Sequence, residues 1–344
     1  MNRVFVTRRI PHAGLDLLTR AGAQVRIGQR DEEAAVPQPV LEDGVRWCDV
    51  LLSLLTERVD RPLLELNPTL RGVANYAVGF NNIDVPAATA LGIPVSNTPG
   101  VLTDSTADLT WALILAVARR IPEAHAYMTA GRYRLWGPNL LLGADVSPGG
   151  SGRRKVLGVI GFGRIGRAVT RRAAGFDMDV LAYDPDARAQ IDADPLARWA
   201  DLDELLRQSD FVTLHPLLTP DTRHLIDERA LRLMKRSAYL INVSRGPVVD
   251  EQALVHALRG GKIAGAALDV FEHEPAMAPG LAECEHVVLV PHIASATVDT
   301  RDRMATMAAE NALAHLRCER APNVVDPDVY AGAPYRERAA TGRR

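Results

Sequence analysis

A chain of 344 residues is long enough for two domains, because most domains hold roughly 100–200 residues. Its composition, 47% hydrophobic and 24% charged, is typical of a globular protein and excludes a disordered or fibrous one. The 40 Lys and Arg residues are balanced by 42 Asp and Glu residues, and the net charge of −2 argues against a nucleic-acid or anionic-membrane partner.

The cysteines and the N-terminal segment indicate the compartment. Cys48, Cys284 and Cys318 are odd in number, far apart and outside any metal-ligand spacing, so we predict reduced thiols and no metal site. No apolar run reaches the roughly 18–20 residues that a membrane helix needs, and MNRVFVTRRI lacks the apolar core of a signal peptide. We therefore expect a cytoplasmic protein with no membrane partner.

The first hundred residues alternate short β-branched runs with amphipathic stretches, from RVFVT to GIPVSN. This alternation predicts βαβ units around a parallel sheet. The apolar-periodic stretch 102–129 predicts a helix that leads into a second domain, and SPGGSGRRK after it predicts a Gly-rich surface loop.

A second series of strands runs from KVLGVIG to HVVLVPH and predicts a second parallel sheet. We expect 296–317 to be a helix that returns to the first domain. The predicted α/β fold thus has a discontinuous substrate domain, 1–100 with 296–330, and a nucleotide domain, 101–295. The tail 331–344 has little apolar surface to bury and is predicted to be disordered.

Three glycines indicate a dinucleotide-binding loop. Gly161, Gly163 and Gly166 follow an apolar strand and begin a helical stretch, the context in which GxGxxG binds a pyrophosphate. Asp184 ends the next strand, at about the ~20-residue distance expected of the acid that binds the adenosine ribose. Its charge would repel a 2′-phosphate, so we expect NAD, with NADP less favoured. Nearby Arg188 keeps NADP open.

Three charged residues follow three strands of the second series. Arg245 suits a carboxylate, His292 suits an acid that titrates near neutrality, and Glu274 suits the anion that keeps such an acid protonated. Together they could catalyse the reduction of a keto acid. From spacing alone, surface charges explain them equally well.

Several long segments resemble the D-isomer-specific 2-hydroxyacid dehydrogenase family over nearly the whole chain. They include VGFNNIDV, GVIGFGRIG, LINVSRGPVVDEQAL, GAALDVFEHEP and VPHIASAT. The resemblance implies two Rossmann-like domains with a cleft between them, and Arg245, Glu274 and His292 as the catalytic residues. It further implies a set of binding residues: Val78 and Gly79 for the substrate carboxylate, Arg164 and Ile165 for the pyrophosphate, and Thr106, Val243, Asp269 and Ser295 for other parts of the cofactor.

The stretch LWGPNLLLG, with Trp136, resembles the region in which glyoxylate and hydroxypyruvate reductases place a tryptophan in the partner subunit's active site. It implies a homodimer and favours glyoxylate or hydroxypyruvate as substrate. A tryptophan of the core or of an ordinary interface is the alternative. The chain departs from the family at His215 and Pro216, because this loop usually has one more residue between histidine and proline.

Two other functions compete with an NAD-dependent dehydrogenase. Formate dehydrogenases resemble this fold but pair glutamine with the histidine, and Glu274 speaks against that reading. A non-catalytic, NAD-sensing scaffold like the transcriptional corepressors is the second alternative, although the chain lacks extended disordered arms.

Overall fold

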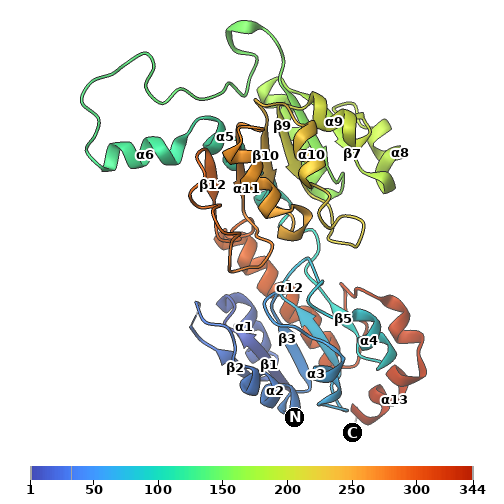
Figure 1. Cartoon of the computed structure of the whole chain (residues 1–344). Helices are drawn as coiled ribbons and strands as arrows, with labels where there is room; N and C mark the ends of the chain where they lie inside the picture. Colours follow the sequence, from blue (N-terminus) through green and yellow to red (C-terminus); the bar gives the residue numbers. More distant parts are fainter. Residues whose placement is uncertain (1, 32, 343–344) are drawn as a thin grey trace. The chain divides into compact units, whose positions relative to one another are not determined.

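The chain divides into two compact units, each described by itself. The structure is a computed structural model that describes residues 2–31 and 33–342. The first unit comprises Met1–Leu102 with Ala296–Arg344, and the second comprises Thr103–Ser295 (Figure 1). None of the described helices combines the length and the apolar character that crossing a lipid bilayer requires.

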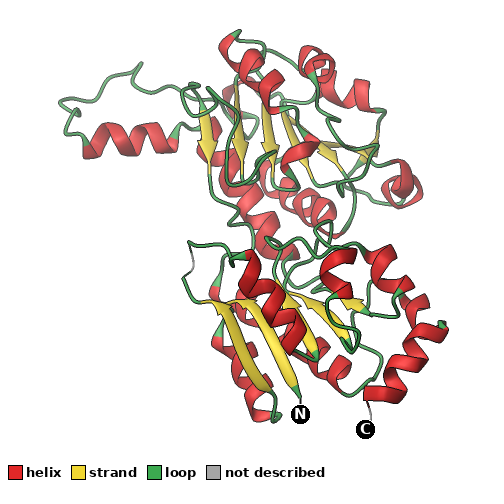
Figure 2. Ribbon diagram, turned by 60° about the horizontal axis from the view of Figure 1, so that its bottom comes forward, coloured by secondary structure: helices red, strands yellow, loops and turns green. Residues whose placement is uncertain are grey.

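The first unit contains a parallel sheet of five strands in the order β2-β1-β3-β4-β5. The strands are β1 Arg3–Arg8, β2 Gln24–Gln29, β3 Val50–Ser53, β4 Gly72–Asn75 and β5 Val95–Ser96. The helices are α1 His12–Arg20, α2 Gln38–Trp47, α3 Arg61–Glu65, α4 Val85–Ala90, α12 Val298–Leu316 and α13 Ala333–Gly342, with a 3₁₀ turn at Pro327–Ala331. Helices cover both faces of this sheet, and each face has its own apolar core (Figure 2).

The second unit contains a parallel sheet of seven strands in the order β12-β11-β10-β9-β6-β7-β8. The strands are β6 Val156–Ile160, β7 Asp179–Tyr183, β8 Arg198–Trp199, β9 Phe211–Leu214, β10 Tyr239–Asn242, β11 Gly265–Leu268 and β12 Val287–Leu289. The helices are α5 Thr103–Ala118, α6 Ile121–Thr129, α7 Arg164–Ala173, α8 Arg188–Asp192, α9 Leu202–Gln208, α10 Glu228–Leu233 and α11 Glu251–Arg259, and short 3₁₀ turns lie at Gly149–Ser151, Ala174–Phe176, Pro185–Ala187 and Gly246–Val248. The prediction of two parallel-sheet α/β domains is confirmed.

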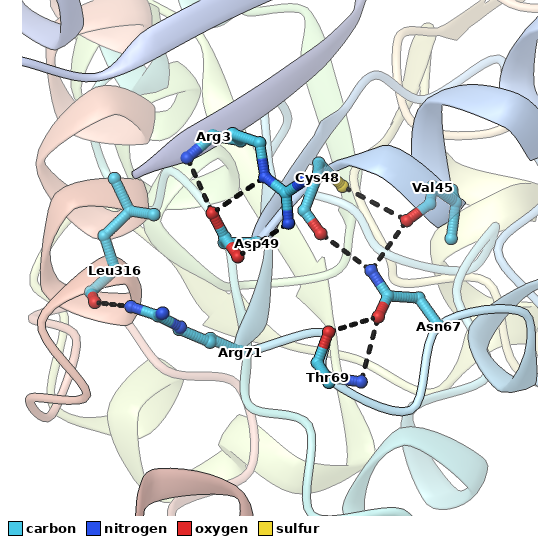
Figure 3. Close-up of polar contacts among 8 residues, drawn as sticks. All are labelled: Arg3, Val45, Cys48, Asp49, Asn67, Thr69, Arg71 and Leu316. Atoms are coloured by element: carbon cyan, nitrogen blue, oxygen red, sulfur yellow. Dashed lines mark hydrogen bonds and ion pairs between the residues drawn. The ribbon is translucent and has the colours of Figure 1, made fainter. Parts of the chain in front are cut away.

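Polar contacts join the starts of the strands of the first unit to neighbouring segments. Arg71, just before β4, donates from Nη1 to the carbonyl of Leu316 at the end of α12, at 2.7 Å (Figure 3). On the same side, the backbone N–H of Arg3 donates to Asp49 at 2.8 Å, and the side chain of Asn67 donates to two carbonyls at the end of α2. The first of these contacts joins the start of β4 to the end of α12, and the others join segments within residues 1–102.

The single helix predicted over 102–129 is wrong, because the structure forms two helices, α5 and α6. Arg120 between them has left-handed backbone, with φ at 53°. Pro122 lacks the N–H that would bond the carbonyl of Ala118 in a continuous helix. That carbonyl accepts instead from the N–H of Ala144 at 2.8 Å, so the break is stable.

The tail predicted to be disordered over 331–344 is a helix, α13, over Ala333–Gly342. Residues 343–344 lie outside the described residues. The hydroxyl of Tyr335 donates to the carbonyl of Cys318 at 3.1 Å, and Arg338 donates to the carbonyls of Leu91 and Pro68, both at 2.6 Å. Polar contacts to backbone carbonyls therefore replace the apolar face that the sequence lacks.

Two buried histidines are expected to make the protein sensitive to acid. Burial lowers the pKa of His315 to about 4 and that of His215 to about 3, from an ordinary 6.5. Both rings are thus neutral in the folded protein, and their stabilisation is complete above pH 6.5 and lost as the pH falls toward these values. For His315 the loss corresponds to about 3 kcal/mol of unfolding free energy.

We expect the thermal midpoint to fall steeply between pH 6.5 and 4. Because glutamine can still bond Ser96, which lies 2.9 Å from His315 Nε2, His315→Gln should flatten this fall. His256→Gln, which changes an exposed histidine of α11, should leave it unchanged. Calorimetry at stepped pH measures the effect, and equal slopes in the parent and His315→Gln would contradict it.

Candidate active site

His292 and Glu274 form a pair at the carboxyl ends of adjacent strands β11 and β12. His292 Nδ1 lies 3.0 Å from Glu274 Oε2, and the two side chains are 27% and 32% exposed. The other carboxylate oxygen of Glu274 accepts from the N–H of Phe271 at 3.0 Å. Burial acts to raise the pKa of Glu274, but the bonds to His292 and Phe271 and the charge of Arg245 outweigh it and lower that pKa. The carboxylate therefore stays ionised beside the imidazole.

The backbone of His292 is held in an uncommon conformation. Its φ is 53°, in the left-handed region that few residues other than glycine and asparagine adopt. Asp269 stabilises this turn, because its carboxylate accepts from the N–H groups of Ile293 and Ala294 at 2.6 and 2.9 Å. Asp269 is fully buried, and burial raises its pKa against the opposing effect of these bonds and of His292. The carboxylate predicted to bind cofactor thus also positions the histidine.

Arg245 follows β10, the strand next to β11. Its Nη1 donates to the carbonyl of Ser244 at 2.7 Å, while Asn242 donates to the carbonyl of Arg245 at 3.0 Å. Burial lowers the pKa of the Arg245 guanidinium, and the charge of Glu274 opposes this. The structure therefore brings Arg245, Glu274 and His292 to one edge of the sheet.

The glycine loop after β6 has the geometry of a phosphate-binding loop. Gly161 has φ at 89°, and a Cβ there would overlap the backbone of His215 and Pro216. A Cβ at Gly166 would overlap the carbonyl of Gly161, whereas the space around Gly163 is open. Arg164 and Ile165 begin α7 directly after it, so N–H groups of the first turn are available to an anion. These features fit a dinucleotide.

Asp184 lies at the end of β7, as predicted, and it also supports the glycine loop. One carboxylate oxygen accepts from the N–H of Phe162 at 2.8 Å, and the other accepts from the N–H of Asp186 at 3.1 Å. Arg188 lies 4.0 Å from the ring centre of Trp199 in a cation–π contact. Its guanidinium thus has an aromatic partner within the unit.

Val78 and Gly79 belong to the first unit, in the loop after β4. Asn97 donates to the carbonyl of Val78 at 2.7 Å, and Asn75 donates to that of Gly79 at 2.9 Å. Among the described residues, neither N–H group of this pair donates a hydrogen bond. The loop can therefore present both N–H groups to a carboxylate.

The remaining predicted residues differ in their surroundings. Thr106, Val243 and Ser295 are buried in the second unit, and the hydroxyl of Thr106 has no hydrogen-bond partner among the described residues. Trp136 is 71% exposed on the loop after α6. Trp136 is therefore not a core residue of the second unit, and that alternative is wrong.

Sequence reasoning missed the asparagines that hold these loops. Asn75 and Asn242 are the last residues of β4 and β10, and Asn97 follows β5 directly. Asn75 and Asn242 each bond the loop that follows their own strand, and Asn97 bonds the loop that follows the neighbouring strand β4. An asparagine that ends a strand before a functional loop is a signal that could have found them, because its side chain both donates and accepts.

Comparison with known proteins identifies relatives over most of the chain. The sequence profile of the D-isomer specific 2-hydroxyacid dehydrogenase, NAD binding domain, matches residues 111–294. Glyoxylate reductases from Korarchaeum cryptofilum and Thermococcus litoralis are 48% and 45% identical to the chain. Each alignment covers 96% of this chain and 98% or 99% of the relative.

Solved structures are also similar to this chain. A protein from Thermus thermophilus superposes with a TM-score of 0.85 at 41% identity, over 94% of this chain and all of that one. An NADPH-dependent glyoxylate/hydroxypyruvate reductase from Sinorhizobium meliloti, in complex with NADP and malonate, has a TM-score of 0.77 at 29% identity, over 97% of each chain.

Proposed function

The chain belongs to the D-isomer-specific 2-hydroxyacid dehydrogenase family, and we propose that it reduces glyoxylate, hydroxypyruvate or a similar small 2-keto acid with NADH. It is an oxidoreductase with a nicotinamide cofactor. The observation that carries the proposal is the His292–Glu274 pair, 3.0 Å apart, at the sheet edge where Arg245 also lies. The relatives are named as enzymes, which gives no support to a non-catalytic scaffold.

Each catalytic residue has a distinct task in this proposal. A nicotinamide cofactor held by the glycine loop would supply the hydride for the keto carbon. Arg245 binds the substrate carboxylate through its planar guanidinium. Because His292 Nδ1 faces Glu274, Nε2 is the nitrogen that donates a proton to the carbonyl oxygen. Glu274, whose pKa is lowered, supplies the negative charge that stabilises the protonated ring.

The test is the loss of absorbance at 340 nm with purified protein and either NADH or NADPH. The substrates are glyoxylate, hydroxypyruvate, pyruvate, phenylpyruvate and 2-ketoisocaproate. We expect the highest kcat/KM with glyoxylate or hydroxypyruvate and NADH. A higher value with one of the bulkier acids would overturn the substrate proposal, and a higher value with NADPH would overturn the cofactor proposal.

For NAD over NADP, we propose Asp184 as the determinant, and Asp184→Asn is the variant that tests it. The amide oxygen can still accept from the N–H of Phe162, so the glycine loop is kept while the charge that repels a 2′-phosphate is lost. We expect the ratio of kcat/KM for NADH to that for NADPH to fall roughly tenfold, about 1.4 kcal/mol. Asp179→Asn, on an exposed carboxylate at the start of the same strand β7, is the matched control. An unchanged ratio would assign the preference to another residue.

We propose that the chain forms a homodimer through its arm, which comprises α6 and the loop that follows it to Gly143. The arm extends from the rest of the second unit and carries exposed apolar side chains, namely Ile121, Met128, Leu135, Trp136 and Leu142 (Figures 1 and 2). Exposed apolar side chains gathered on one segment favour a protein partner. The proposed partner is a second copy, with Trp136 of each subunit at the other's substrate site, as the family resemblance implies.

Charge on the arm is expected to dissociate the dimer. The double substitution Leu135→Asp and Leu142→Asp should yield a monomer in light scattering coupled to size-exclusion chromatography, because a buried unpaired carboxylate costs several kcal/mol. Leu196→Asp, on an exposed leucine outside the arm, should leave a dimer. A monomeric parent, or a dimeric double variant, would contradict the proposed interface.

A further inference from the structure

Glu251, the first residue of α11, is a buried carboxylate to which the reaction proposed above gives no role. It is 2% exposed, and its two oxygens accept from the backbone N–H groups of Glu272 and Ala278, the second at 2.8 Å. Its partners are thus two N–H groups at either end of one loop. The helix does not need it as a cap, because the side chain of Asp250 accepts from the N–H of Ala253 at 2.9 Å.

The loop that Glu251 holds carries the catalytic glutamate. Glu274 lies between Glu272 and Ala278, and it reaches His292 from this loop. A carboxylate that accepts hydrogen bonds from both ends of a short loop restricts the backbone conformations that the loop can adopt. Glu251 therefore limits where the carboxylate of Glu274 can lie.

A second contact links this loop to the loop of Arg245. A Cβ at Gly246 would overlap the carbonyl of Phe271 and the nitrogen of Glu272, so the two loops touch there, backbone against backbone. Gly246 begins a short 3₁₀ turn, and α11, which begins with Glu251, follows it. The segment that carries Arg245 thus ends in the residue that fixes the loop of Glu274.

We propose that Glu251 is a positioning residue that sets the distance between Glu274 and His292. This inference rests on the proposed function. Glu251 touches none of the reacting groups and acts through the backbone of Glu272 and Ala278.

Glu251→Gln tests the proposal with almost no change in side-chain volume. An amide has one acceptor oxygen, and its NH₂ group would face one of the two N–H donors, so at least one bond is lost. We expect kcat to fall roughly 10- to 100-fold, as for a small misplacement of catalytic groups, with KM for NADH within about twofold of the parent. Glu228→Gln is the matched control, because Glu228 is the first residue of α10 and is exposed.

A double-mutant cycle separates positioning from general structural damage. If Glu251 acts through Glu274, then Glu251→Gln should have less than about a threefold effect on kcat in a Glu274→Gln background. Equal effects in both backgrounds would overturn the proposal. Glu251→Asp keeps the charge but is one methylene shorter, so it should lose less activity, and it replaces Glu251→Gln in the cycle if that variant does not fold.

Hydrogen exchange gives a readout that does not depend on turnover. Exchange of the backbone amides of 271–278 should rise in Glu251→Gln and stay at the parental rate in Glu228→Gln. Unchanged exchange would overturn the proposal even if activity fell. If the parent reduces no keto acid while exchange rises in Glu251→Gln, the proposed function fails and the role of Glu251 in holding the loop stands.

Discussion

Replacing His292 by alanine is expected to lower kcat for keto-acid reduction by roughly 10²–10⁴-fold, the range for loss of a general acid. The affinity for NADH should change little, because the glycine loop and Asp184 lie on other strands of the sheet. Steady-state kinetics and NADH fluorescence titration measure the two quantities.

The left-handed backbone at residue 292 requires a second variant. Alanine is strained at a φ of 53°, whereas asparagine tolerates it. His292→Asn should therefore lose as much activity as His292→Ala if the proton matters, and much less if alanine acts only through strain. His256→Ala, on an exposed histidine of α11, is the control. An unchanged rate in both variants at position 292 would remove His292 from the mechanism.

The sequence predicted the positions of the site residues because they follow strands directly. Strand ends are marked by apolar runs, and parallel strands bring their carboxyl ends to one edge, so Arg245 and His292 could be placed there before the structure was known. The glycine loop was predictable for a similar reason, since Gly161 and Gly166 avoid overlaps that any side chain would cause.

The contacts that the sequence did not predict are those between segments far apart in the chain. Asp269 could be proposed as a cofactor residue by resemblance, but its bonds to Ile293 and Ala294 depend on the packing of β11 beside β12. The helix α13 was missed because Arg338 anchors it to carbonyls near Leu91 rather than through an apolar face. Side chains that bond backbone leave no periodic pattern in a sequence.

The break between α5 and α6 was within reach of sequence reasoning. Pro122 lies in the middle of the apolar-periodic stretch, and a proline inside a helical pattern ends or kinks the helix. Hydrophobic periodicity outweighed it in the prediction because the residues on both sides of the break continue the apolar pattern. The exposure of Ile121 and Met128 in the structure shows that this pattern did not mark a core.

Arg245→Gln is expected to reduce kcat/KM for the keto acid by roughly 10²–10⁴-fold, because two charge-assisted hydrogen bonds of about 1.5–3 kcal/mol each are lost. The bond from Nη1 to the carbonyl of Ser244 fixes the guanidinium, so little of this loss can be recovered by rearrangement. Most of it should be a rise in KM for the keto acid, since the carboxylate is charged in both ground state and transition state.

Arg245→Lys separates charge from shape. A lysine keeps the positive charge near Glu274 but cannot bind a carboxylate with two parallel bonds. The kcat/KM of Arg245→Lys for the keto acid should therefore lie between those of Arg245→Gln and the parent. A kcat/KM of Arg245→Lys equal to the parent's would show that charge alone suffices. A kcat/KM of Arg245→Gln equal to the parent's would remove Arg245 from the site. Arg236→Gln, on an exposed arginine of the same unit, should keep the parental rate. If the lysine variant instead loses as much as the glutamine variant, the bidentate geometry rather than the charge binds the substrate, and Arg245 is then the residue that orients the keto group toward His292.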